Sequence, residues 1–261
     1  MYLNDADLAR RLAVASEAVW EAGQLILSFY RRPQVLDIKS KGPQDLVTAA
    51  DHAADALLQK RLAAAFPDDS FLTEESGGEG GRHLWVIDPI DGTGNFARGL
   101  PHFCISIAFC VDGRAQLGVI YAPIQDELFV ARAGGGATCN GRTLSVSGAR
   151  EPGRSLVDAG YSHRHPKSDY LVVIGRLLEN GFGFSQAGSA ALGLAYVADG
   201  RLDGYCEQDL FAWDVLAGLL LVREAGGWAS DFPLADGPAD GKPVLACTPA
   251  LAADLRRLTG I

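Results

Sequence analysis

Apolar residues recur at steps of three and four between residues 8 and 29, and polar residues occupy most of the positions between them. This spacing predicts an amphipathic helix that packs on a sheet and ends before Pro33. A second helix is expected to begin at Thr48 and to run to Phe66, because Thr-Ala-Ala-Asp resembles a capping box with Asp51 in place of glutamate. The chain is therefore expected to start with two helices.

Short apolar runs replace the helical pattern between about Phe71 and Ser147. Glycine, proline and aspartate separate several of these runs, which is typical of hairpin turns between neighbouring strands. This stretch is therefore expected to form an antiparallel meander. The predicted strands are Leu84 to Ile87, Phe103 to Val111, Ala115 to Tyr121, Glu127 to Ala131 and Thr143 to Val146.

Helices alternate with strands again after Pro152, as in an α/β arrangement. The chain is accordingly divided near residue 150 into an α+β lobe, residues 1–150, and an α/β lobe, residues 151–261, which together form one catalytic unit. Thr248-Pro249 is expected to supply the N-cap and the first-turn proline of the last helix. The other elements predicted here are helices at Tyr170 to Asn180, Ser189 to Asp199 and Phe211 to Ala225, and a strand at Gly204 to Glu207.

A net charge of -9 over 261 residues argues against a general nucleic-acid binder, since such proteins usually present a basic face. It does not exclude an anionic substrate, because bound divalent cations change the local charge of a site. The five cysteines are scattered without Cys-x-x-Cys spacing and are expected to be reduced core thiols. No basic and apolar leader opens the sequence and no apolar run approaches ~18 residues, so a cytoplasmic enzyme without membrane contact is expected.

The segment Trp85 to Asn95 carries the most informative chemistry, because an apolar run ends in Asp88 and Asp91 with Gly-Thr-Gly directly behind them. Carboxylates at the end of a strand are suitable ligands for hard cations, and small residues that open a helix present N–H groups to a phosphate. Pro89 has no N–H and a fixed φ, which favours a shaped turn over a continuing strand. The pattern suggests metal-assisted phosphate chemistry, whereas two solvated aspartates, or Asp91 as a plain N-cap, are the alternatives.

Glu74 and Asp214 are further acidic candidates, because each occurs where a predicted element ends or begins. Glu74 follows the apolar pair Phe71-Leu72 and precedes a glycine-rich stretch, which is consistent with a strand that ends in a loop. Asp214 lies at the start of an apolar helix, where an acid favoured by the helix dipole is an equally good explanation.

Together these residues resemble the inositol monophosphatase family of Mg²⁺-dependent, Li⁺-sensitive phosphatases. The matching motifs occur in the family's order over roughly residues 8 to 257. The resemblance implies a layered αβαβα sandwich of the inositol monophosphatase and fructose-1,6-bisphosphatase type, and a homodimer. The motifs are Asp45 to Asp51, Phe71 to Ser76, Trp85 to Phe96, and Ala212-Trp213-Asp214 to Gly227.

The resemblance also implies a metal centre of two to three Mg²⁺ ions. Paired divalent ions can stabilise both the entering and the departing oxygen of an in-line phosphoryl displacement. Asp88 would bridge two of the ions, and a third, weaker ion is expected near Glu74. The implied ligands are the side chains of Glu74, Asp88, Asp91 and Asp214 and the backbone carbonyl of Ile90.

In a site of this family, Glu74 and Thr93 orient and activate the water that attacks phosphorus, and the amides of Gly92 and Thr93 hold the phosphate oxygens. Asp91 acts, through the metal it binds, on the side of the leaving alkoxide. Asp51 is expected in the outer shell of the third metal, although a helix-start role explains it as well. The mechanism needs no covalent phosphoenzyme.

The alcohol part of the substrate is expected to meet Asp91, Ser189, Ala190 and Glu207. Ser189 and Ala190 match the family segment whose backbone approaches the ring hydroxyls, and Glu207 matches the acid that accepts hydrogen bonds from them. A solvated strand-end acid is the alternative for Glu207. The basic loop Ser162 to Lys167 is a candidate for the mouth of the pocket, or a plain solvated loop.

Two departures from the family pattern limit the transfer. Gly94 stands where inositol phosphatases commonly have threonine, so one hydroxyl near the phosphate is missing. The segment Lys39-Ser40-Lys41 has no unique register against the family's single lysine near the catalytic water. Neither departure removes a metal ligand.

The function that best fits the sequence is Mg²⁺-dependent hydrolysis of inositol phosphates, a phosphoric monoester hydrolase with myo-inositol 1-phosphate as the leading substrate. Histidinol phosphate and other sugar or nucleotide phosphates are the alternatives, because related enzymes share the metal site and differ on the alcohol side. A regulatory binding protein on the same scaffold is the alternative from a different class, and it predicts erosion of the acidic residues. Their presence favours catalysis.

Overall fold

The computed structural model describes residues 3–31, 39–42, 45–234 and 241–261 of the chain. For residues 39–42 and 45–47 it describes the backbone alone. Pro33 and the side chains of Asp45 and of Lys39-Ser40-Lys41 therefore lie outside the described residues, together with the expectations that rest on them.

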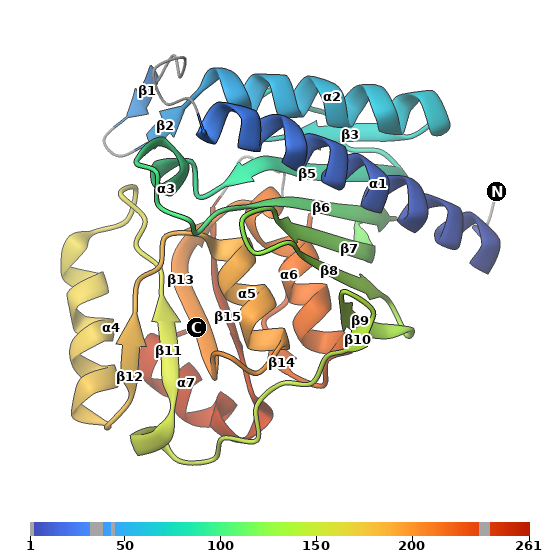
Figure 1. The fold of residues 1–261 in the computed structure, drawn as a ribbon. Coiled ribbons are helices and arrows are strands. Elements are labelled where there is room, and N and C mark those ends of the chain that lie inside the picture. The colour runs from blue at the N-terminus through green and yellow to red at the C-terminus, as the bar shows by residue number, and fades with distance from the viewer. Residues whose placement is uncertain (1–2, 32–38, 43–44, 235–240) are drawn as a thin grey trace.

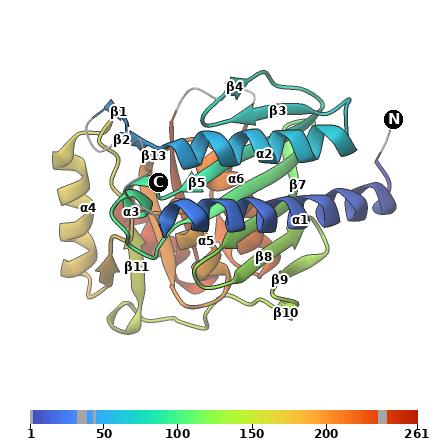
Figure 2. The same cartoon turned by 45° about the horizontal axis from the view of Figure 1, so that its top comes forward.

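The helices that build the fold are α1 (Asp5–Tyr30), α2 (Ala49–Ala65), α3 (Thr93–Ala97), α4 (Lys167–Glu179), α5 (Ala190–Ala198), α6 (Ala212–Glu224) and α7 (Ala252–Thr259), with 3₁₀ turns at η2 (Pro152–Arg154) and η3 (Pro249–Leu251). Helices α1 and α2 lie side by side over the outer face of an eight-stranded sheet (Figure 2). Helices α5 and α6 lie between that sheet and a five-stranded sheet, and α4 and α7 cover the far side (Figure 1). The expected αβαβα architecture is confirmed.

The larger sheet contains β3 (Ser70–Thr73), β4 (Gly77–Gly78), β5 (His83–Asp91), β6 (Cys104–Val111), β7 (Arg114–Ala122), β8 (Glu127–Arg132), β9 (Gly136–Cys139) and β10 (Arg142–Thr143). Its strand order is β10-β9-β8-β7-β6-β5-β3-β4. Each neighbouring pair from β5 to β10 is antiparallel, so the predicted meander is confirmed, whereas β3 runs parallel to β5.

The strand predicted at Thr143 to Val146 is wrong beyond Thr143. The Val146 N–H donates to the carbonyl of Ala225 at 3.1 Å, so this segment leaves the sheet and binds the end of α6. The sequence pattern also missed β9, because its first residue, Gly136, belongs to a run of three glycines that was interpreted as a turn.

The smaller sheet contains β11 (Leu156–Ala159), β12 (Gly183–Ser185), β13 (Gly204–Leu210), β14 (Trp228–Ala229) and β15 (Lys242–Cys247). Its order is β12-β11-β13-β15-β14, with parallel pairs from β12 to β13 and antiparallel pairs from β13 to β14. The sequence pattern predicted β13 alone among these strands. A hairpin of β1 (Lys39–Gly42) and β2 (Asp45–Val47) lies beside α3, at the end of the molecule where α2 begins (Figure 1).

Helix caps were predicted at Thr48 and at Thr248, and the structure confirms the first and changes the second. At α2 the capping box is confirmed, since the Thr48 N–H donates to Asp51 Oδ2 at 2.8 Å and the Ala50 N–H donates to the Thr48 hydroxyl at 3.1 Å. At the last helix the Thr248 hydroxyl donates instead to the carbonyl of Ser147 at 2.6 Å. The 3₁₀ turn η3 therefore follows Thr248 in the chain, and α7 begins after it at Ala252, which is later than predicted.

The core fills the three spaces between the five layers. All five cysteines lie within it, buried and without a disulfide bond, as the sequence analysis expected. In the described part of the chain, none of the helices combines the length and apolarity needed to cross a membrane.

Candidate metal and phosphate site

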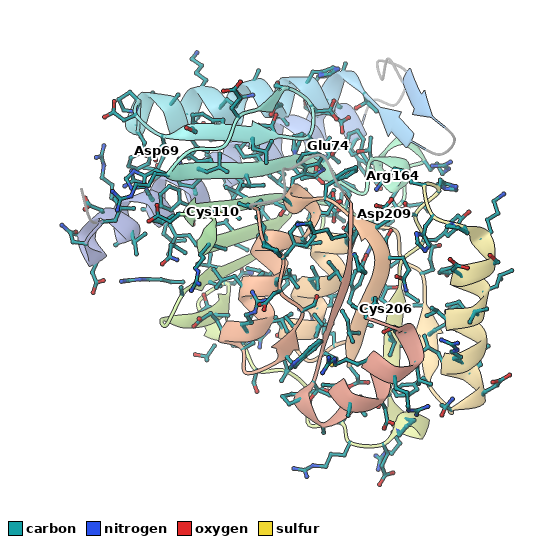
Figure 3. The ribbon with its side chains drawn as sticks, turned by 180° about the vertical axis from the view of Figure 1, so that it is seen from behind. Asp69, Glu74, Cys110, Arg164, Cys206 and Asp209 are labelled. Atoms are coloured by element: carbon teal, nitrogen blue, oxygen red, sulfur yellow. The ribbon has the colours of Figure 1, made fainter. Side chains whose placement is uncertain are left out.

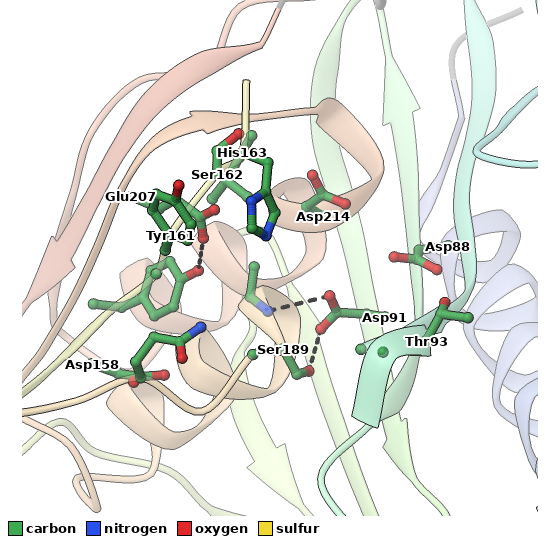
Figure 4. Close-up of a pocket in the computed structure, with 18 of the residues that line it drawn as sticks. Asp88, Asp91, Thr93, Asp158, Tyr161, Ser162, His163, Ser189, Glu207 and Asp214 are labelled. Atoms are coloured by element: carbon green, nitrogen blue, oxygen red, sulfur yellow. Dashed lines mark hydrogen bonds between the residues drawn. The ribbon is translucent and has the colours of Figure 1, made fainter. Parts of the chain in front are cut away.

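A cavity of about 470 Å³ opens where the ends of β5, β11 and β13 meet the first turns of α3, α5 and α6 (Figure 4). Its walls combine residues from both sheets, so neither half of the chain forms it alone. Among the described residues that line it, His163 and Arg164 are the basic side chains. The acidic side chains on its walls are Glu74, Asp88, Asp91, Asp158, Glu207 and Asp214.

Asp88, Asp91 and Asp214 come together at one end of this cavity, with a carboxylate oxygen of each within 4.8 Å of the other two. Asp88 pairs with Ser106 on β6 and Asp91 pairs with Cys104, so two residues of β5 oppose one residue of β6. This is a β-bulge at the proline of β5, and it lets both aspartates of the strand reach one site. Asp214 arrives from the first turn of α6.

Burial raises the pKa values of all three carboxylates. Burial raises the pKa of Asp88 well above its ordinary value, and the nearby charges of Glu74 and Asp91 raise it further. The pKa of Asp214 is also raised well above its ordinary value, first by burial and then by the charge of Glu74. Ionised carboxylates in this arrangement repel one another, and hard divalent cations that bind oxygen ligands would relieve the repulsion.

Asp91 is held by the start of helix α5. Its Oδ1 accepts the backbone N–H of Ala190 at 3.2 Å, its Oδ2 accepts that of Ala191 at 2.8 Å, and the Ser189 hydroxyl also donates to Oδ2. These bonds and the positive end of the helix dipole favour the ionised carboxylate, although burial raises its pKa. Asp91 is therefore not the N-cap of its own following helix, where Gly92 stands.

Asp214 combines the two roles that the sequence left open. Its Oδ2 accepts the backbone N–H of Phe211 at 2.8 Å, as expected of an acid at the start of a helix. The same carboxylate belongs to the group of three acids. Glu74 lies at the end of β3 and lines the same cavity, but it is not within the group of oxygens that Asp88, Asp91 and Asp214 form.

Gly92 and Thr93 connect the acidic group to helix α3. Gly92 has φ 92, and a Cβ on it would lie 3.1 Å from the carbonyl oxygen of His102, so glycine is required at this close approach. The Thr93 hydroxyl lies 2.8 Å from the Ile90 carbonyl oxygen and 3.0 Å from Asp51 Oδ1. Asp51 therefore has the helix-start role that the sequence offered for it, and it also accepts a hydrogen bond from Thr93.

Glu207 lies at the other end of the cavity, on β13 (Figure 4). Burial raises the pKa of Glu207 to about 7, and a hydrogen bond of 2.6 Å from the Tyr205 hydroxyl opposes that rise. Ser189 and Ala190 line the cavity between Glu207 and Asp91, with the Ser189 hydroxyl committed to Asp91.

The basic loop lines the mouth of the cavity through Ser162, His163 and Arg164. Arg164 Nε donates to Asp209 Oδ2 at 2.8 Å, and the two residues lie side by side in Figure 3. The guanidinium also lies 4.4 Å from the centre of the Phe211 ring. Arg164 is thus a paired, fixed residue rather than a freely solvated one.

Several residues of the site were missed by the sequence analysis. Asn95 Nδ2 donates to the carbonyls of His102 and Ala187, each at 2.8 Å, and so ties α3 to the segment before α5. Asp158 Oδ1 accepts the Ala187 N–H at 3.0 Å on the neighbouring wall. Tyr205 was detectable in principle, since it stands two positions before Glu207 on a strand and shares its face. Asn95 and Asp158 had no such local signal.

Comparison with known proteins decides the family. The model of the inositol monophosphatase family matches residues 7–256 of the chain. The chain belongs to the inositol monophosphatase family. Among curated proteins, it is 39% identical over 252 residues to the inositol-1-monophosphatase of Rhizobium meliloti (strain 1021), covering 95% of each. It is 42% identical over 226 residues to Nus factor SuhB of Escherichia coli (strain K12), covering 85% of each.

Solved structures of the inositol monophosphatase family have the same fold. The extragenic suppressor protein suhB of Bartonella henselae is 38% identical, with a TM-score of 0.88 over 95% of this chain and 97% of that one. The inositol monophosphatase of Anabaena (Nostoc) sp. PCC 7120 is 36% identical, with a TM-score of 0.84 over 97% and 96%. The expected family and fold are confirmed, and this inositol monophosphatase family member is a phosphomonoesterase acting on a phosphate monoester.

The acidic cavity of this phosphomonoesterase fits the metal dependence of its family. Its described walls carry six carboxylates against His163 and Arg164, and Arg164 is neutralised by Asp209. Oxygen ligands of this kind suit Mg²⁺ and similar hard cations, whereas no described cysteine or histidine joins the group of three acids.

Proposed function

We propose that this member of the inositol monophosphatase family hydrolyses polyol monophosphates, with myo-inositol 1-phosphate as the leading substrate. The observation that carries the proposal is one cavity with the carboxylates of Asp88, Asp91 and Asp214 at one end and Glu207 at the other. The first end suits divalent cations and a phosphate, and the second suits a group of neighbouring hydroxyls.

The acidic end is proposed to hold two to three Mg²⁺ ions. When bound, these ions supply Lewis-acid stabilisation to the oxygens that enter and leave phosphorus. A carbonyl oxygen has two lone pairs, so the Ile90 carbonyl can serve a cation while it accepts from Thr93. The residues proposed as ligands are Glu74, Asp88, Asp91, Asp214 and, through its carbonyl, Ile90.

In the proposed reaction a water oxygen forms a bond to phosphorus while the bond from phosphorus to the alcohol oxygen breaks. The hydrogen of the Thr93 hydroxyl is directed at Ile90 and Asp51, which leaves its lone pairs to accept a hydrogen bond from that water. Glu74 takes a proton from the attacking water, the departing oxygen takes a proton from a second water, and the hydroxide that remains regains a proton from Glu74. The products are the alcohol and inorganic phosphate.

The phosphate is proposed to rest on the amides of Gly92 and Thr93. Because Gly92 has no side chain, the backbone at this position can approach a ligand closely. Backbone N–H groups that are already oriented stabilise the charge on phosphate oxygens without reorganising during the reaction.

Related substrates of the same reaction class differ on the alcohol side. A carboxylate at Glu207 would attract the ammonium group of histidinol phosphate as well as accept from the hydroxyls of a sugar phosphate. We favour the polyol because Glu207 is half-buried beside Tyr205, where it can serve as a fixed acceptor for neighbouring hydroxyls.

A regulatory function is the second candidate, and one observation favours it. Relatives of 42% identity carry the name Nus factor SuhB. We propose that any such role is additional to catalysis, because the carboxylates that the reaction needs are all present in one cavity. Asp88→Asn would separate the two functions, since it removes a metal ligand without changing the surface of the protein.

A phosphate-release screen with Mg²⁺ tests the proposed function. The substrates are myo-inositol 1-phosphate, histidinol phosphate, fructose 1,6-bisphosphate and adenosine 3′,5′-bisphosphate, with EDTA and Li⁺ as inhibitors in parallel. Turnover that is highest for the inositol phosphate, lost in EDTA and reduced by Li⁺ would support the proposal. Turnover of none of the four would refute it.

Two variants separate the metal end from the alcohol end. Asp88→Asn is expected to lower kcat at least about a thousandfold for every substrate, because the bound metal would lose one of its charged ligands. Glu207→Gln is expected to change the ratio of kcat/KM among substrates and to leave the Mg²⁺ dependence intact. The same preparations, examined by sedimentation, test the proposed homodimer.

A further inference from the structure

Tyr205 and Glu207 lie two residues apart on β13, so their side chains share one face of the strand. The Tyr205 hydroxyl donates to Glu207 Oε2 at 2.6 Å, and only 2% of the tyrosine is exposed. The other carboxylate oxygen, Oε1, accepts no hydrogen bond from a residue that the structure describes. One oxygen of the acid is therefore occupied, and the second is available to a ligand.

Two glycines pack closely against this pair. A Cβ on Gly160 would lie 1.9 Å from Glu207 Oε2 and 2.7 Å from the Tyr205 hydroxyl oxygen. A Cβ on Gly193 would lie 2.7 Å from Cδ2 of the tyrosine ring. The backbones of the segment after β11 and of α5 thus pack directly against the pair, and the ring cannot move without displacing one of them.

We propose that Tyr205 is a positioning residue for substrate recognition, which holds the Glu207 carboxylate so that Oε1 faces the alcohol part of the substrate. This inference rests on the proposed function, in which Glu207 accepts hydrogen bonds from substrate hydroxyls. A carboxylate on a flexible glutamate would lose side-chain entropy when it binds, and a carboxylate that is already held in place avoids much of that cost.

The same hydrogen bond favours the protonation state that the role requires. Burial raises the pKa of Glu207 to about 7, and donation from Tyr205 is the largest effect that lowers it. Without the tyrosine, more of the glutamate would be protonated near neutral pH and one of its oxygens would become a donor. The other ionisable groups that interact with Glu207 are Asp91 on β5, Asp158 on β11, Arg164 in the loop after β11, Cys206 on β13, Asp214 on α6 and Tyr170 on α4.

A purely structural role predicts a different result. If Tyr205 only satisfied a buried acid, its removal would lower stability and leave the affinity for every substrate unchanged. A positioning role predicts a loss that is confined to substrates with hydroxyl groups and that depends on Glu207.

Tyr205→Phe tests the proposal, because it removes the hydroxyl and keeps the ring. The substrates are myo-inositol 1-phosphate and p-nitrophenyl phosphate, a monoester without hydroxyl groups. We expect KM for the inositol phosphate to rise about tenfold, the equivalent of one hydrogen bond, with kcat changed less than about twofold. Both constants for p-nitrophenyl phosphate are expected to stay at the wild-type values.

Tyr121→Phe is the matched control. Tyr121 is also 2% exposed and also donates to a carboxylate, Asp126 Oδ1, at 2.8 Å, but neither residue lines the cavity. Its loss should change stability without changing KM. Gly160→Ala approaches the Tyr205–Glu207 pair from the other side and should raise KM in the same selective way, so the test does not depend on one variant folding well.

A double variant decides whether Tyr205 acts through Glu207. In a Glu207→Gln background, Tyr205→Phe should cause no further rise in KM, because the group it positions is already changed. Fully additive effects, or an unchanged KM in the single variant, would overturn the inference. A wild-type enzyme without preference for polyol phosphates would overturn it together with the proposed function, whereas a preference that survives Tyr205→Phe overturns the inference alone.

Discussion

Asp91 Oδ2 accepts the backbone N–H of Ala191 at 2.8 Å, across 100 residues of the chain. Asp91 Oδ1 accepts the neighbouring amide of Ala190 at 3.2 Å. A carboxylate at the end of β5 therefore accepts hydrogen bonds from backbone amides at the start of α5 that have no partner within the helix, and it does so within the group of three acids. One side chain links the proposed chemistry to the packing between two layers.

This relationship predicts opposite effects on stability for two aspartates of one site. In EDTA near neutral pH, Asp91→Asn should lower the free energy of unfolding by about 1–3 kcal/mol, because the amide nitrogen must face an N–H donor. Asp88→Asn should leave stability unchanged or raise it, because it removes a repelling charge. Urea denaturation measures both, and equal destabilisation by the two variants would contradict the asymmetry.

The raised pKa values of Asp88 and Asp214 predict how metal stabilisation depends on pH. The native state binds these protons more tightly than the unfolded chain, so the stability of the metal-free protein falls as pH rises from 3.8 through the raised values. Mg²⁺ competes with the same protons. The gain in Tm from Mg²⁺ should therefore grow as pH rises above 3.8. A gain that shrinks over this range in thermal scans would argue against a carboxylate metal site.

The ionised Glu207 carboxylate should lower the free energy of unfolding above neutral pH. Its pKa rises from 4.5 to about 7 on folding, so the stabilisation is fully present below 4.5 and is lost as pH increases to about 7. The loss amounts to about 3–4 kcal/mol, at about 1.4 kcal/mol per pKa unit. Glu207→Gln should be more stable than wild type at pH 8 and similar at pH 4.5. Glu179→Gln, on the exposed side of α4, is the control and should follow wild type at both values.

Arg11 should matter for stability and not for catalysis. Its guanidinium binds both oxygens of Asp69, at 3.1 and 2.9 Å, and lies between the rings of Phe66 and Phe109. Asp69 lies far from Arg164 at the mouth of the cavity (Figure 3). Arg11→Met would leave a buried carboxylate without its cation and is expected to cost about 3–5 kcal/mol in chemical denaturation, with kcat unchanged at temperatures where the variant is folded.

The control for Arg11 is Arg132, whose partner Asp5 is exposed. Arg132→Met should cost less than about 1 kcal/mol, because exposed ion pairs contribute little. A large loss of kcat in folded Arg11→Met would contradict the prediction, because it would couple the Arg11–Asp69 pair to the acidic site.

The hydrogen bonds of Asn95 predict that an isosteric substitution is more damaging than a truncation. Its amide donates to the carbonyls of His102 and Ala187, and a carboxylate in its place could only repel them. Asn95→Asp should therefore lower kcat/KM and stability more than Asn95→Ala does, although aspartate is the closer match in shape. Initial rates and urea denaturation of both variants, side by side, measure the order. The reverse order would contradict the prediction that Asn95 contributes through its hydrogen bonds between α3 and the segment before α5.

Local signals were sufficient for the long helices and for the meander. The three-to-four periodicity and the capping box at Thr48 act within one element, so they are legible without knowledge of the fold. The strands β11 and β12 were missed because three or four residues carry too little pattern to separate a short parallel strand from a loop. The predicted strand does not continue to Val146, because the Val146 N–H binds a distant partner in the sequence, the carbonyl of Ala225.

The candidate site divides in the same way. Asp88 and Asp91 are visible because a proline and a glycine turn lie beside them in sequence. The functional motifs identified the family, and the family comparison confirmed it. What sequence spacing could not supply is which oxygens meet, since Asp214 reaches the cavity from helix α6 and Glu207 reaches it from the smaller sheet.

By itself the sequence determined the family, the main helices and the acids available for metal and phosphate chemistry, because each of these depends on neighbouring residues. The tertiary structure alone decided that Asp91 caps α5, that Thr93 reaches Asp51 and that two glycines enclose Tyr205 with Glu207. The physical reason is range: propensity and capping act over a few residues, whereas burial, charge coupling and close backbone packing arise between segments brought together only by the folded core.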